Sequence, residues 1–175
     1  DPEHLEKSMI LLKKMEATRK VAHAKDLSWD PREPSSSLYN SVIIGLLHSV
    51  VMKSGDFPLD QTPIPNHEEK IQIAEQATRL LDSMLLRDSS MPTISTYLRL
   101  MRLWHASRSD EAGERSEEIL SRMQLYKVFS EEEDLSKGAE KTALQFALRS
   151  WVVSATAGKP GAAQRASLLI GRMRE

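Results

Sequence analysis

The chain has 175 residues, a formal net charge of −1 and no cysteine. This length suits one domain with a buried core, and the missing cysteine excludes a disulfide scaffold, a thiolate metal site and a cysteine nucleophile. No apolar run reaches the roughly 18 residues of a membrane span, and no signal-peptide pattern opens the chain. The near-zero charge gives no bulk electrostatic reason to expect nucleic acid.

The first predicted element is a helix within residues 1–24, which contains the run LLKKM at residues 11–15. Two large aliphatic residues, two further residues and a methionine recur in the same order at Met84, Met123 and Met173. Such self-similarity indicates an internal repeat. Because no partner helix precedes it, we interpret residues 1–24 as the second helix of a partial repeat.

A second block is also repeated. Residues 38–46, 96–104 and 143–151 align without a gap. Three aligned columns fall at i, i+4 and i+7, which is the spacing of one helical face. Each repeat is therefore predicted to contain two helices, and the columns should form the core together with their neighbours. We expect eight of these residues to be largely buried: Tyr39, Ile43, Leu46, Tyr97, Met101, Trp104, Leu148 and Trp151.

The repeats are expected at residues 36–87, 92–127 and 137–175. Prolines and a Gly-Asp pair predict a long loop at 54–66 inside the first repeat, and the acidic stretch 130–134 is typical of a connector. The predicted fold is all-α: a right-handed α-solenoid of antiparallel helix pairs that forms a single domain over residues 1–175. We expect this domain to be a segment of a longer repeat protein.

Charge is unevenly placed along the chain. Three windows around the first helices of the repeats, 36–54, 92–108 and 141–159, contain no aspartate or glutamate. A solenoid with these helices on one side would be basic there and acidic on the other side. The alternative is that these helices are simply the more buried ones. The windows carry seven basic residues: Lys53, Arg99, Arg102, Arg108, Lys141, Arg149 and Lys159.

The common catalytic motifs are missing from the sequence. It contains no phosphate-binding glycine loop, no HExxH and no GxSxG, and its five histidines are scattered. We therefore predict no enzyme activity, no catalytic residue, no cofactor and no metal site. Trp104 and Trp151 have flat faces on which bases could stack, but their shared column with Leu46 favours a place in the core.

The repeated blocks resemble the pentatricopeptide repeat. Residues 39–43 (YNSVI) resemble the opening of its first helix, and residues 92–97 (PTISTY) resemble the stretch that leads into it. Residues 74–77 (AEQA) followed by Leu80, Leu81 and Met84 resemble its second helix. The tetratricopeptide repeat, with its helix–turn–helix of about 34 residues, is the second choice.

This resemblance implies a non-catalytic protein that binds single-stranded RNA in mitochondria or plastids and acts in RNA processing, stability or translation. Each repeat of the family reads about one base with two or three side chains. The first reading positions fall on Ser41, Arg99 and Phe146, and the second ones on Ser36, Ile94 and Lys141. Arginine and lysine there would hold phosphates. The predicted RNA-binding residues are Ser41, Arg99, Arg102, Lys141 and Arg149.

Arg102 and Arg149 share one column and are predicted to form a ladder facing the groove. Alternatively, each pairs with an acid of a neighbouring helix, such as Glu117 or Glu118. At the level of the whole protein the alternative is a protein–protein interaction scaffold, for example a helical-repeat subunit of a larger assembly, because the concave surfaces of solenoids also suit peptides.

Overall fold

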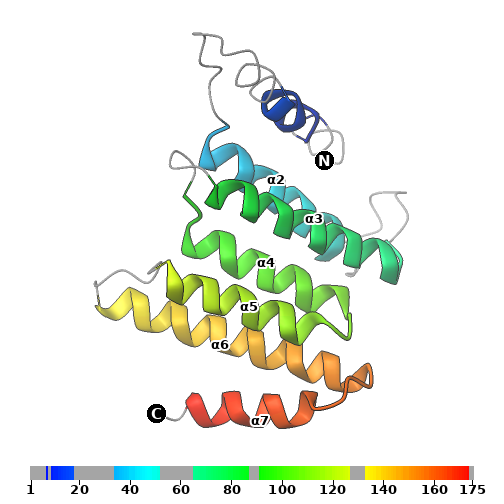
Figure 1. The fold of residues 1–175 in the computed structure, drawn as a ribbon, viewed down its shortest axis with the longest axis vertical. Coiled ribbons are helices and arrows are strands. Elements are labelled where there is room, and N and C mark those ends of the chain that lie inside the picture. The colour runs from blue at the N-terminus through cyan, green and yellow to red at the C-terminus, as the bar shows by residue number, and fades with distance from the viewer. Residues whose placement is uncertain are drawn as a thin grey trace.

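The computed structural model describes residues 7, 9–17, 34–51, 65–86, 91–126 and 133–173. Within these ranges the regular secondary structure is helical, with no strand (Figure 1). The prediction of an all-α chain is confirmed. Besides the helical residues 9–17, the helices are α2 (Ser36–Val51), α3 (His67–Leu85), α4 (Ile94–Ser107), α5 (Ala112–Leu125), α6 (Glu133–Thr156) and α7 (Ala162–Arg172).

Side-chain caps fix the starts of two helices. At α3, the Asn66 side chain accepts a hydrogen bond from the backbone N–H of Glu69, whose carboxylate accepts from the N–H of Asn66. Thr93 and Thr96 exchange the same pair of bonds at α4. Such a capping box satisfies two backbone donors that have no partner inside the helix, so both helices begin at a defined residue.

Each helix from α2 to α7 packs on the next one along the chain, with α2 also packing on α4 and α4 on α6. Figure 1 shows the helices stacked side by side, with short turns after α4 and α6 that send the chain back in the opposite direction. The helices α2, α4 and α6 thus form a row, here called the first row, and α3, α5 and α7 alternate with it.

The predicted core columns are found in the core. Seven of the eight residues are buried, whereas Leu148 is half-buried and packs against the core. Leu148 lies on α6, which is the last first-row helix among the described residues, so its column lacks a further neighbour on one side. The tryptophan rings also make polar contacts between helices. Nε1 of Trp104 donates to Oγ1 of Thr78 at 3.0 Å, and Nε1 of Trp151 donates to the Glu117 carboxylate at 3.0 Å.

The start of α6 differs from the sequence expectation. The sequence predicts a connector over the acidic stretch 130–134 and a third repeat that begins at 137, yet α6 already begins at Glu133. Glutamate is a good helix former, and acidic residues are favoured near a helix N-terminus by the helix dipole. Most of the predicted loop 54–66 lies outside the described residues, as do residues 1–6 and 18–24 of the predicted partial repeat.

Candidate nucleic-acid interface

The five predicted RNA-binding residues lie on first-row helices. Arg102, Lys141 and Arg149 are exposed, and Arg99 is half-buried. Ser41 is exposed on α2, where its hydroxyl donates to the carbonyl of Ser37 at 2.9 Å. The Ser41 hydroxyl is therefore already engaged within its own helix, while the four cations belong to α4 and α6.

Arg99 and Arg102 share one face of α4 with His105, because helical residues three apart are neighbours. Arg149 of α6 is close to that face, since its charge and its backbone both act on the pKa of His105. The structure therefore brings Arg102, His105 and Arg149 to the same region, and these three residues form a cluster. Lys141 lies eight residues before Arg149, about 12 Å along α6 at about 1.5 Å per residue, and is not part of this cluster.

The described ion pairs lie on other elements of the molecule. They join Arg79 to Glu75, Arg115 to Glu111 and Glu118, Arg122 to Asp82 and Glu118, Lys159 to Glu114, and Arg165 to Glu117. Each acid in these pairs belongs to α3 or α5 or directly precedes α5. In the part of the chain that the structure describes, α4 contributes no partner to an ion pair.

This distribution weighs against one of the two interpretations of the arginine column, namely pairing with Glu117 or Glu118. Glu117 is bound by Arg165 and Trp151, and Glu118 by Arg115 and Arg122. Neither acid pairs with Arg102 or Arg149. Within the described ranges, Arg102 and Arg149 have no carboxylate partner.

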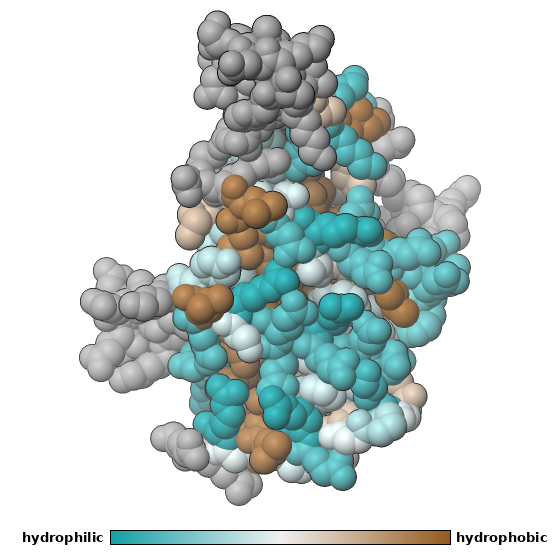
Figure 2. All heavy atoms as spheres, in the orientation of Figure 1, coloured by the Kyte–Doolittle hydropathy of each residue, from teal (hydrophilic) through white to brown (hydrophobic). Residues whose placement is uncertain are grey.

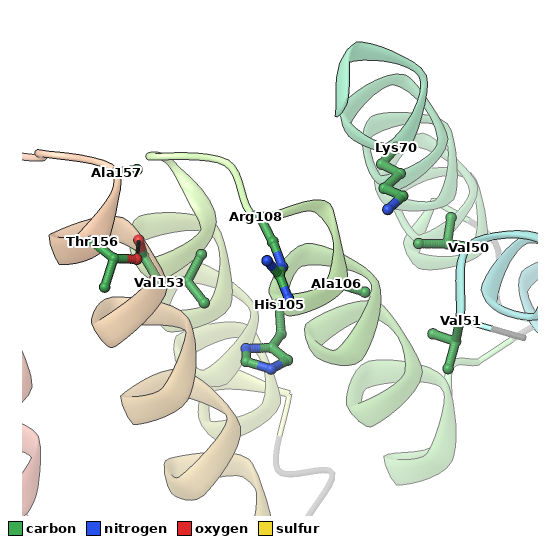
Figure 3. A pocket seen from close by; sticks show the side chains of 9 residues that line it. All are labelled: Val50, Val51, Lys70, His105, Ala106, Arg108, Val153, Thr156 and Ala157. Atoms are coloured by element: carbon green, nitrogen blue, oxygen red, sulfur yellow. Dashed lines mark hydrogen bonds between the residues drawn. The ribbon is translucent and has the colours of Figure 1, made fainter. Parts of the chain in front are cut away.

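A hollow of about 670 Å³ opens beside this cluster, where α2, α4 and α6 end (Figure 3). Lys70 extends into it from the first turns of α3, and His105 and Arg108 come from the end of α4. None of its lining residues is acidic. The remaining walls are small or apolar: Val50, Val51, Ala106, Val153, Thr156 and Ala157.

Arg108 is positioned by the end of α4. It adopts a left-handed conformation with φ of 57° and ψ of 22°, and its N–H donates to the carbonyl of His105 at 3.4 Å. A left-handed residue commonly terminates a helix. Figure 3 shows that this turn brings the Arg108 side chain next to the His105 ring, on the wall of the hollow.

His105 is half-buried, and its Nδ1 atom is buried without a hydrogen-bond partner among the described residues. Burial lowers the pKa of His105, and the charges of Arg149 and Arg108 lower this pKa further, against a smaller opposing effect of a hydrogen bond with the Arg149 backbone. At neutral pH the ring is therefore uncharged.

The hollow was not predicted from the sequence. In the sequence, Arg108 is one of the basic residues around the first helices, His105 is one of five scattered histidines, and Lys70 belongs to a helix whose first turn also holds Glu68 and Glu69. These residues become neighbours through the packing of α3 and α4. The signal in the sequence is weak: a lysine near the start of one helix, and a histidine and an arginine at the end of the next.

Among the residues described, no group of three or more histidine, aspartate or glutamate side chains is arranged to hold a metal ion. No described helix is long and apolar enough to cross a membrane. Comparison with protein-family models, with curated proteins and with solved structures finds no match for this chain.

Proposed function

We propose that this chain is a non-catalytic RNA-binding protein, built as a right-handed α-solenoid of helix pairs of the pentatricopeptide type. In this proposal it acts in RNA processing, stability or translation in a mitochondrion or plastid. The alternation of α2–α7 and the contacts within the first row support a repeat of two-helix units. The organelle and the repeat family come from the sequence resemblance.

The observation that carries the proposal is the contrast in ion pairing. Acids of α3 and α5 hold the cations of α5 and α7 that form ion pairs, while Arg99, Arg102, Lys141 and Arg149 of the first row have no such partner in the described structure. An unpaired arginine keeps its hydrogen-bond donors free for a phosphate. A nearly neutral chain can thus present one surface of uncompensated positive charge.

The same geometry indicates how the RNA would be held. Arginine and lysine contacts to phosphates fix the strand without reading its sequence. Ser41, whose hydroxyl is engaged by Ser37, would contribute little to base recognition in this arrangement. We therefore expect binding to single strands with weak sequence preference.

The test is a fluorescence anisotropy titration of the chain with labelled single-stranded RNA at several salt concentrations. We expect measurable binding at low salt and an affinity that falls steeply with salt, because each phosphate contact to a single strand contributes about 0.7 to the slope of log K against log salt. Oligonucleotides of different sequence should bind alike. Absence of binding at low salt, or binding that salt does not weaken, would contradict the proposal.

A protein-binding scaffold is the second candidate, and one observation favours it. Leu168 and Ile170 are 61% and 40% exposed on α7, which lies at one end of the stack of helices in Figure 1. The two side chains are two residues apart and so point to different sides of the helix, but exposed apolar groups at the end of a stack of helices can mark a protein contact. The face shown in Figure 2 is mostly hydrophilic, and its apolar groups form separate patches. If the scaffold is correct, Leu168→Ser with Ile170→Ser should abolish binding of the protein partner and leave RNA affinity unchanged.

A further inference from the structure

The hollow at the end of the first row gathers positive charge from three helices. Lys70, Arg108 and Arg149 lie in or next to it and form no ion pair in the described part of the chain. Glu68 and Glu69 share the first turn of α3 with Lys70 but are exposed and do not line the hollow. The charge that the described residues bring to the hollow is therefore positive.

The helix ends oppose this charge only in part. The helices α2, α4 and α6 all reach the hollow with their C-terminal turns, and a helix C-terminus carries about half a negative charge. Three such ends amount to about one and a half negative charges, against the full charges of Lys70, Arg108 and Arg149. The balance favours an anion that lies near Lys70, His105 and Arg108.

The side chain of the hollow that best suits a phosphate is Arg108. Its planar guanidinium can bind a phosphate with two hydrogen bonds, and the uncharged His105 ring lies next to it (Figure 3). The Nδ1 atom of that ring is buried, so the ring reports on the hollow and does not itself bind the phosphate. Lys70 adds a point charge from the other side of the hollow.

The remaining walls suit the rest of a nucleotide. Val51 and Val153 are half-buried and present apolar surface in the hollow, and a volume of about 670 Å³ lies within the roughly 300–1,000 Å³ of small-ligand pockets. A ligand with a charged end and a flat, less polar body fits both parts. A nucleoside phosphate has that form, whereas an inorganic anion leaves the apolar walls uncovered.

We propose that this hollow binds one nucleotide, with its phosphate on Lys70 and Arg108 and its nucleoside against Val51 and Val153. The role of this site in RNA binding rests on the proposed function. In the RNA complex, the bound nucleotide belongs to the single strand that continues over Arg102 and Arg149. The hollow then anchors one position of the strand.

The probes are inorganic phosphate and adenosine 5′-monophosphate, titrated into the whole chain and followed by the NMR signals of the histidine rings. His105→Gln identifies the His105 signal by its loss. We expect both probes to move this signal saturably, the nucleotide at lower concentration, and to raise the pKa of His105, because a bound phosphate offsets the positive charges of Arg149 and Arg108. The pocket variant is Lys70→Gln with Arg108→Gln.

Arg79→Gln with Arg172→Gln is the matched control, since it also removes two positive charges. Arg79 lies nine residues after Lys70 and so on the opposite face of α3, and Arg172 is exposed on α7. The pocket variant should lose the response to both probes and bind RNA about tenfold to a hundredfold more weakly, the loss expected for one or two charge-assisted hydrogen bonds. The control should behave as the unmodified chain.

An unchanged His105 signal, with equal RNA affinity of the pocket and control variants, would overturn the nucleotide site and leave RNA binding by the first row intact. A response to the nucleotide without any RNA binding would support the site and refute the proposed function. A response to phosphate that the nucleoside does not strengthen would contradict the contact with the valines.

Discussion

At the scale of single residues, Trp104 shows how the sequence pattern becomes stability. Its side chain is 2% exposed, its Nε1 donates to Thr78 of α3, and the guanidinium of Arg115 lies 5.7 Å from the ring centre. The residue thus joins α3, α4 and α5. A base-stacking role would require an accessible face, so Trp104 belongs to the packing between helices, as its column predicted.

Trp104→Ala should lower the free energy of unfolding by about 3–5 kcal/mol, the usual loss for a large core aromatic. Trp104→Phe keeps an aromatic ring but loses the hydrogen bond to Thr78, and should cost clearly less. Urea denaturation followed by circular dichroism measures both. A loss below about 1 kcal/mol for the alanine variant would mean that the ring is not part of the core.

At the scale of elements, the contact between α5 and α6 depends on Gly113. A Cβ atom at this position would overlap the Trp151 ring, and the Gly113 N–H donates to Oγ of Ser154 at 2.9 Å. One turn further along, the hydroxyls of Ser116 and Ser150 are 2.8 Å apart. Small residues therefore let these two helices approach closely.

Gly113→Ala should destabilise the fold by about 1–3 kcal/mol through overpacking, despite the gain of up to about 1 kcal/mol in helix propensity. Gly171→Ala is the control, because a Cβ atom added there on α7 would meet nothing within 4 Å, and it should be neutral or stabilising. Thermal unfolding of both variants decides the question. An equal effect at the two positions would contradict the close approach of α5 to Trp151.

The helices and the core columns were predictable because helical periodicity is a local property of the sequence. Trp104 and Trp151 were placed in the core by their spacing alone, whereas the start of α6 at Glu133 was missed because an acidic run fits a connector and a helix N-terminus equally well. The hollow needed tertiary structure, since Lys70 and Arg108 come from helices whose packing no local pattern encodes.

At the scale of the whole molecule, a net charge of −1 conceals an uneven distribution of ion pairs among the described residues. Acids of α3 and α5 are paired with cations of α5, α7 and the turn before α7. Arg102 of α4 and Arg149 of α6 form no ion pair with these acids in the described structure. The proposed function requires that these two arginines, and not the total charge, control the affinity for RNA.

The most direct test is the salt dependence of RNA binding by Arg102→Ala with Arg149→Ala. We predict a lower affinity for all RNA sequences alike and a slope of log K against log salt that is flatter by about 0.7 per lost phosphate contact, with little change in stability because both residues are exposed. Arg79→Ala with Arg172→Ala should leave the slope unchanged. If the Arg102 and Arg149 variant instead binds RNA normally and unfolds more easily, these arginines are structural and the proposed interface is wrong.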